Sequence, residues 1–450
     1  MRCCLSNNSA EKSTTKRMAS LDQFRGYAVA GMVLVNFLGN YACAPRILRH
    51  TNDYCSYADT IMPNFLFAVG FSIAVVWYRA LSKAASAMGL EIGGLDSSSV
   101  RGVAREVQGK LFRRSLALML FAFVLYFPWG EPRLLSRIST GSFWFEIWKR
   151  HWFQTLTHIA WTTLWLLPIL SWSWRGKWSW IAGGAITHVL LSEVFYFHFV
   201  HQNPAGIDGG PLGFLTWGIP AALGLWAGEY WSRSELLRQE GVTAPSWEIR
   251  WLAIALAWML AGWLCSSLTR SYDIDVQVGG ADSSGESGRS GESGRSGESG
   301  REVRVVADKL ARSPVVDGLK VFASGEHRGW AELPLVPPPT WQERSWNYWM
   351  MSQRAGTLSY LVFAAGFSLG LYVLWDSIVR RFAIEVPLFR CFGRNALFCY
   401  ALHGFLIDAI GLWVPKDAQP WIVYSSLLGL FAVLFGVAWM LERKRIFIRL

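Results

Sequence analysis

The chain has 450 residues, of which 52% are hydrophobic and only 17% are charged, and its formal net charge is +11. An ordinary soluble domain carries about a quarter charged residues, so this composition excludes that class and predicts an all-α integral membrane protein. The 26 Trp residues suit a protein with several spans, because Trp gathers at both membrane interfaces. The basic residues lie between apolar segments, where they set topology, so we expect the lipid bilayer as a partner and no nucleic acid.

Ten segments are long and apolar enough to cross a bilayer, which predicts a bundle of about ten transmembrane helices. With the N-terminus inside, the inner segments hold 25 Lys and Arg residues, the short outer loops 7, and one long outer loop 11. This distribution predicts cytosolic N- and C-termini, although the loop that contains Lys149 and Arg150 runs against the rule. The predicted spans are 24–41, 58–79, 111–129, 152–170, 178–200, 212–232, 249–268, 355–378, 394–414 and 419–440.

These spans divide the chain into five parts. A basic cytosolic N-terminus covers 1–23, the first seven helices cover 24–268, a long outer loop covers 269–354, the last three helices cover 355–440, and a basic cytosolic tail covers 441–450. We therefore expect a multi-pass protein, located in the inner membrane if the chain is bacterial.

The long outer loop contains two unlike stretches. A Ser-Gly-Glu-Ser-Gly-Arg unit occurs three times in 284–301, and such a composition predicts a flexible linker. Four aromatic residues follow near the next helix, where we expect interfacial anchors, with a sugar-stacking platform as the alternative, namely Trp341, Trp346, Tyr348 and Trp349. In the first outer loop, Cys43 and Cys55 leave open a disulfide or two free thiols.

Ionisable and amide side chains gather at both ends of the first two predicted helices. Asp22 and Arg25 share one face at the inner end, where an ion pair is the simplest interpretation. Asn36 lies about three turns further along the same helix. A short loop then brings His50 and Asp59 to the same outer mouth, and a His beside a carboxylate is suited to act as a general base.

The later helices supply further polar residues. Gln154 begins the fourth predicted helix, and Asn395, Cys399 and His403 form a stripe at steps of four on the ninth. His403 is either a functional group or a buried imidazole bonded to a backbone carbonyl. Because polar groups that face lipid are costly, several such helices in one bundle predict an aqueous or ligand-filled cavity.

Several motifs along the chain carry a resemblance to a known family. They are Ser20-Leu21-Asp22-x-x-Arg25-Gly26, Met32-Val33-Leu34-Val35-Asn36, Arg49-His50, Ala58-Asp59-x-x-x-Pro63 with Gly70-x-Ser72, Leu223-Gly224-x-x-Ala227-Gly228, and Gly393-x-Asn395-x-x-x-x-Tyr400-x-x-His403. Together they cover the whole predicted core, and they resemble the heparan-α-glucosaminide N-acetyltransferases and their bacterial-type relatives without the luminal N-terminal domain. The chain departs from the family at Asn203-Pro204-Ala205-Gly206, where the acid of the family's turn is missing.

The resemblance implies a transmembrane acyltransferase that moves an acetyl group from cytosolic acetyl-CoA to an amine or hydroxyl of a glucosamine-type saccharide or glycan outside. It implies His50 as the catalytic base or a transiently acylated nucleophile, Asn36 as a donor to the thioester carbonyl and Asp59 as the residue that orients His50. The candidates for binding acetyl-CoA are Asp22, Arg25, Gln154, Asn395 and His403. No metal is expected, and a homodimer is compatible with such a bundle.

Two other functions remain open from the residues alone. Polar groups in spans are equally typical of a transporter or flippase for a small polar or glycolipid substrate. The altered Asn203–Gly206 turn also leaves room for a structural or sensory protein of enzymatic ancestry.

Overall fold

The computed structural model describes residues 18–51, 53–239, 248–273, 310–325, 329–336 and 344–447. Within these ranges the chain folds into helices, with only two isolated β-bridges, Asp273 with Arg344 and Leu310 with Trp346. The predicted all-α class is therefore confirmed. The Ser-Gly-Glu-Ser-Gly-Arg repeat lies outside the described residues.

Each of the ten predicted apolar segments coincides with a helix. The helices are α1 (Ala19–Leu38), α2 (Ile61–Ala87), α3 (Ser97–Tyr126), α6 (Thr155–Leu166), α7 (Trp174–Leu191), α9 (Phe214–Gln239), α10 (Glu248–Ser266), α13 (Leu358–Phe382), α15 (Ala396–Gly411) and α16 (Pro420–Arg443). Shorter helices occupy the connections, namely α4 (Pro132–Leu135), α5 (Gly141–Glu146), α8 (Phe197–His201), α12 (Val316–Ala323) and α14 (Pro387–Arg394).

Five helical stretches in the described part are long and apolar enough to cross a membrane, judged by length and composition. They are Ala58–Ala87, Trp174–His201, Glu248–Tyr272, Leu358–Phe382 and Pro420–Arg443. The second of these continues from α7 through a π-helical turn, Ser192–Tyr196, into α8. Two of the other predicted spans contain helices of only 12 and 16 residues, α6 and α15.

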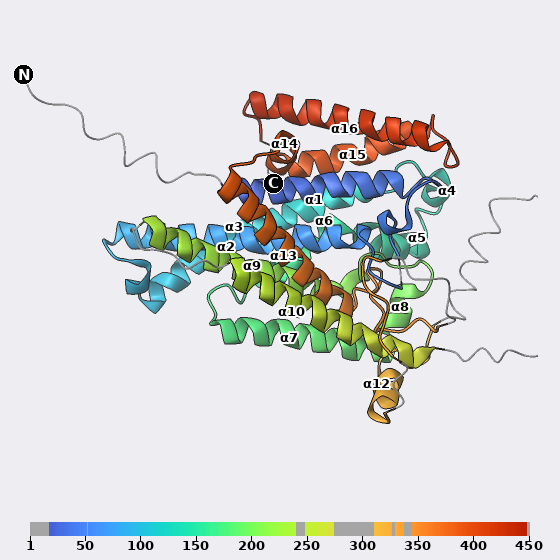
Figure 1. Ribbon diagram of the computed structural model, residues 1–450, viewed down its shortest axis with the longest axis horizontal. Coiled ribbons are helices and arrows are strands. Elements are labelled where there is room, and N and C mark those ends of the chain that lie inside the picture. Colours follow the sequence, from blue (N-terminus) through green and yellow to red (C-terminus); the bar gives the residue numbers. More distant parts are fainter. Residues whose placement is uncertain are drawn as a thin grey trace, which may run out of the picture.

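The long helices lie roughly along one axis of the molecule (Figure 1). The connection between α2 and α3 lies at one end of this axis, and α4, α5, α8 and α12 lie at the other. The most extensive helix pairs are α2 with α9 and α10 with α13, followed by α1 with α14. Helices far apart in the sequence therefore form the core.

Glycines allow two of these pairs to approach closely. A Cβ atom on Gly70 of α2 or Gly224 of α9 would lie 1.8 or 2.0 Å from a backbone oxygen of the other helix. The same holds for Gly26 of α1 and Gly393 of α14, at 1.7 and 1.8 Å. Small residues at helix crossings allow such backbone contact, so close packing accounts for the glycines of several family-like motifs.

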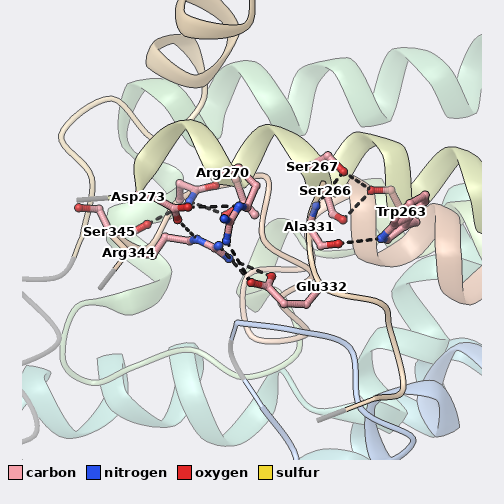
Figure 2. A network of polar contacts seen from close by, with 11 residues as sticks. Trp263, Ser266, Ser267, Arg270, Asp273, Ala331, Glu332, Arg344 and Ser345 are labelled. Carbon is pink, nitrogen blue, oxygen red and sulfur yellow. Dashed lines mark hydrogen bonds and ion pairs between the residues drawn. The ribbon is translucent and has the colours of Figure 1, made fainter. Parts of the chain in front are cut away.

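Four charged side chains hold the described parts of the long outer loop against the end of α10 (Figure 2). Arg344 bonds Glu332 through both of its terminal nitrogens, at 3.1 and 3.2 Å, and also pairs with Asp273. Arg270 lies 3.2 Å from Asp273 and 3.4 Å from Glu332. We call this group, Arg270, Asp273, Glu332 and Arg344, the four-charge clasp. Charge pairs with bidentate geometry fix both distance and orientation.

The segment 329–336 runs from the clasp to the first outer loop. Ala331 accepts a hydrogen bond from Trp263 Nε1 at 3.1 Å and donates its backbone N–H to Ser267 at 3.1 Å (Figure 2). Leu335 then donates its backbone N–H to the carbonyl of Cys55 at 2.9 Å. The long loop thus packs against the segment that precedes Asp59.

Tyr348 and Trp349, before α13, are buried rather than exposed, which contradicts both the interfacial-anchor and the sugar-platform predictions for them. Trp346 is half-buried, and Trp341 lies outside the described residues. Tyr348 is fully buried, with its hydroxyl 2.9 Å from His188 Nδ1, and Trp349 donates to the carbonyl of Val315 at 2.9 Å. The reason is that the loop folds back over the bundle and covers these rings. Cys43 and Cys55 are both free thiols.

Candidate functional site

A cavity of about 300 Å³ lies where α1 ends and α2 begins. Six separate parts of the chain supply its polar lining, namely Asn36 of α1, His50 and Thr51, Gln154 and Thr155 at the start of α6, Asp208, Gln353 and Arg354, and Tyr400 of α15. Three of these, Asn36, His50 and Gln154, are candidates from the sequence. The structure therefore brings them together around one space.

His50 is held through one ring nitrogen by two oxygen acceptors. Its Nδ1 lies 2.9 Å from Asp59 Oδ1 and 3.1 Å from Gln353 Oε1. The Gln353 amide is oriented by its Nε2, which donates to Asp208 Oδ1 at 2.6 Å. Since both partners of Nδ1 accept, Nδ1 carries the hydrogen, and Nε2 is the basic nitrogen of neutral His50.

Asp59 is itself fixed by its neighbours. The residue is 1% exposed and lies in the short 3₁₀ turn Ala58–Thr60 that leads into α2. Its Oδ2 accepts hydrogen bonds from Ser56 N and Ser56 Oγ, both at 2.9 Å, and from Thr51 Oγ1 at 3.2 Å. A carboxylate held by this many donors is well placed to orient an imidazole, as predicted for Asp59.

Two effects of opposite sign act on the pKa of His50. Burial lowers the pKa, but the hydrogen bond and charge of Asp59, aided by Asp208 and Gln353, outweigh it and raise the pKa above the ordinary 6.5. The raised pKa makes His50 a stronger base than a free imidazole.

Asp208 is a cavity residue that the sequence interpretation missed. It lies in the loop before α9 with a left-handed backbone (φ 54°), is 5% exposed, and burial raises its pKa to about 6. Asp208 lies two residues after the Asn203–Gly206 turn. An acid between glycines, in Gly206-Ile-Asp208-Gly209, is the signal that could have found it.

Asn36, which lines the cavity, is bonded to His403 of α15. Asn36 Nδ2 lies 3.2 Å from His403 Nε2, and His403 Nδ1 bonds the carbonyl of Tyr400 one turn earlier. An amide nitrogen only donates, so His403 accepts at Nε2 and is neutral. His403 is thus bonded both to a functional candidate and to a backbone carbonyl.

The remaining candidates lie at the opposite end of α1. Arg25 is 3.9 Å from Asp22 and bonds Ser72, and Arg394 is 3.9 Å from the same Asp22. Asn395 is buried and directly follows Arg394. The predicted Asp22–Arg25 pair is therefore present, as part of a larger ionic group that joins α1 to α14. The eight candidates separate into two groups, with Asp22, Arg25 and Asn395 away from the cavity.

No protein-family model matches the chain, and no curated protein matches it. The case for a function therefore rests on the site itself and on the motif resemblance.

Proposed function

We propose that the chain is a membrane-embedded acyltransferase that moves an acetyl group from acetyl-CoA to an amine or hydroxyl of a saccharide. The observation that carries the proposal is the bonding of His50 Nδ1 to Asp59 beside Asn36 in one cavity. This arrangement supplies a general base with a fixed tautomer and an amide donor, the two groups that acyl transfer requires.

The reaction follows from the roles of these groups. The acceptor nitrogen or oxygen attacks the thioester carbon while His50 Nε2 takes its proton, so a bond to carbon forms and negative charge moves onto the carbonyl oxygen. The remaining N–H of Asn36 donates to that oxygen. When the carbonyl re-forms, the carbon–sulfur bond breaks, and the departing thiolate receives the proton from His50. Asp59 stabilises the imidazolium between these steps.

The proposal includes ten membrane spans with cytosolic N- and C-termini. In support, the segments that this topology places inside hold 25 Lys and Arg residues, against 7 in the short outer loops. Arg25 and the cavity residue Asn36 lie eleven residues apart on α1, which is roughly 16 Å along the helix. Arg25 is paired with Asp22, and Arg394 is paired with Glu442. Because these two arginines are paired with carboxylates, we assign the binding of the CoA phosphates to them together with the basic inner loops. The acetyl end of the donor would then reach Asn36 and His50.

One observation favours a second candidate, a transporter. Thr157, His158 and Thr162 of α6 are buried and continue from the cavity wall into the bundle. Buried polar side chains along a span are typical of a substrate path.

An assay on the purified protein in proteoliposomes separates the two candidates. Acetyl-CoA with a labelled acetyl group is supplied on one side and a panel of amino sugars on the other. If the chain is an acyltransferase, we expect covalently acetylated sugar that carries the label. Unmodified sugar that crosses the bilayer, with no label incorporated, would contradict the acyltransferase proposal and support transport.

A further inference from the structure

Two tyrosines meet at the cavity. Tyr126, the last residue of α3, and Tyr400 of α15 have their hydroxyl oxygens 2.6 Å apart, and Tyr126 Oη also lies 3.2 Å from the backbone nitrogen of Leu156. Of the two tyrosines, Tyr400 lines the cavity and Tyr126 does not. Both separations are those of ordinary hydrogen bonds.

The chemistry of the partners fixes the direction of one of these bonds. The backbone N–H of Leu156 can only donate, so Tyr126 Oη accepts there. Either hydroxyl is able to donate in the Tyr126–Tyr400 pair. With Tyr126 as the donor of that pair, Tyr400 accepts and keeps its own hydrogen for an acceptor at the cavity.

Tyr400 stands close to the other donor of the site. His403, three residues along α15, bonds Asn36, and Asn36 and Tyr400 both line the cavity. The second N–H of Asn36 and the hydroxyl of Tyr400 are thus two donors on adjoining parts of α1 and α15. Paired donors of this kind stabilise an oxygen on which negative charge develops.

We infer that Tyr400 is a second catalytic donor, which binds the thioester oxygen of the acyl donor together with Asn36, and that Tyr126 is its positioning residue. The inference rests on the proposed acyl transfer. It adds a second donor to the thioester oxygen, beside Asn36, and the residue that positions this donor.

The test compares kinetics of the full-length protein with Tyr400→Phe, Tyr126→Phe and the control Tyr424→Phe, which alters a 40% exposed tyrosine of α16. Loss of one donor to a developing oxyanion lowers kcat about a hundredfold, so we expect this for Tyr400→Phe with the KM for acetyl-CoA within twofold. Tyr126→Phe loses one neutral hydrogen bond and should lower kcat about fivefold, again with KM unchanged. If the two tyrosines had only a structural role, the variants would not lower kcat while leaving the KM for acetyl-CoA unchanged.

Tyr400→His keeps an N–H donor and should retain more activity than Tyr400→Phe, which separates donor loss from misfolding. If wild type is active and Tyr400→Phe keeps kcat within twofold of the Tyr424→Phe control, the inference is overturned and the proposed function stands. If wild type acetylates no acceptor, the proposed function fails and the inference falls with it.

Discussion

His50 has two acidic neighbours with different geometry. Asp59 bonds its Nδ1 directly, whereas Asp208 reaches it through Gln353. Asp59 is thus the main cause of the raised pKa of His50, and Asp208 contributes less to it. The pKa of Asp208 itself is raised mainly because its carboxylate is buried.

Asp59→Asn should lower the pKa of His50, because the charge that raises the pKa is removed. A general base acts when it is unprotonated, so wild-type transfer should increase as the pH rises through a midpoint above 6.5. In the variant this midpoint should move to lower pH, and the plateau rate should fall about a hundredfold, because the tautomer of His50 is no longer fixed. The measurement is the pH–rate profile, with Asp53→Asn as control. An unmoved midpoint would refute the assignment of Asp59.

Asp208→Asn should stabilise the fold at neutral pH. The folded pKa of Asp208, about 6, lies above its ordinary 3.8, so the ionised acid costs stability. This cost is absent below about pH 4, grows as the pH rises to about 6 and is then constant, at roughly 3 kcal/mol. The difference in Tm between variant and wild type in detergent should follow that course. A difference that is independent of pH would contradict the account.

At the scale of elements, the four-charge clasp connects the long outer loop, which also carries Gln353, to the end of α10. Glu332 and Asp273 share Arg344, whose side chain is only 10% exposed. Removal of one partner from a buried charge group leaves the others uncompensated, which costs several kcal/mol.

Arg344→Gln should therefore lower the free energy of unfolding by about 3 kcal/mol and also reduce the transfer rate, since 344–354 carries Gln353. Lys320→Gln is the control, because its pair with Asp317 is 73% and 53% exposed and contributes at most about 1 kcal/mol. Thermal unfolding and the transfer assay measure both effects. Equal Tm values for the two variants would show that the clasp does not hold the loop.

At the scale of the whole molecule, local patterns allowed the helices to be predicted. Apolar runs identify all ten helical segments, and the Asn36, His50 and Asp59 group could be predicted because one short loop joins α1 to α2. The contacts of Gln353 could not, since Gln353 is 303 residues from His50 and 145 from Asp208, and only the fold brings them together. The burial of Tyr348 was missed for the same reason, because its hydroxyl bonds His188, which is 160 residues away in the sequence.

The ionic group and the cavity lie at opposite ends of α1. Asp22, Arg25 and Arg394 form the ionic group at one end, and His50 lines the cavity at the other. The transmembrane transfer that we propose needs this separation, with the donor bound on one side and the acceptor on the other.

The most direct test of the account is acetyl transfer from labelled acetyl-CoA by His50→Gln, measured beside wild type and the control His198→Gln. Loss of a general base lowers rates by two to four orders of magnitude, so we expect about a thousandfold loss for His50→Gln with unchanged Tm and wild-type rates for His198→Gln. Transfer by His50→Gln within a fewfold of wild type would contradict the central claim.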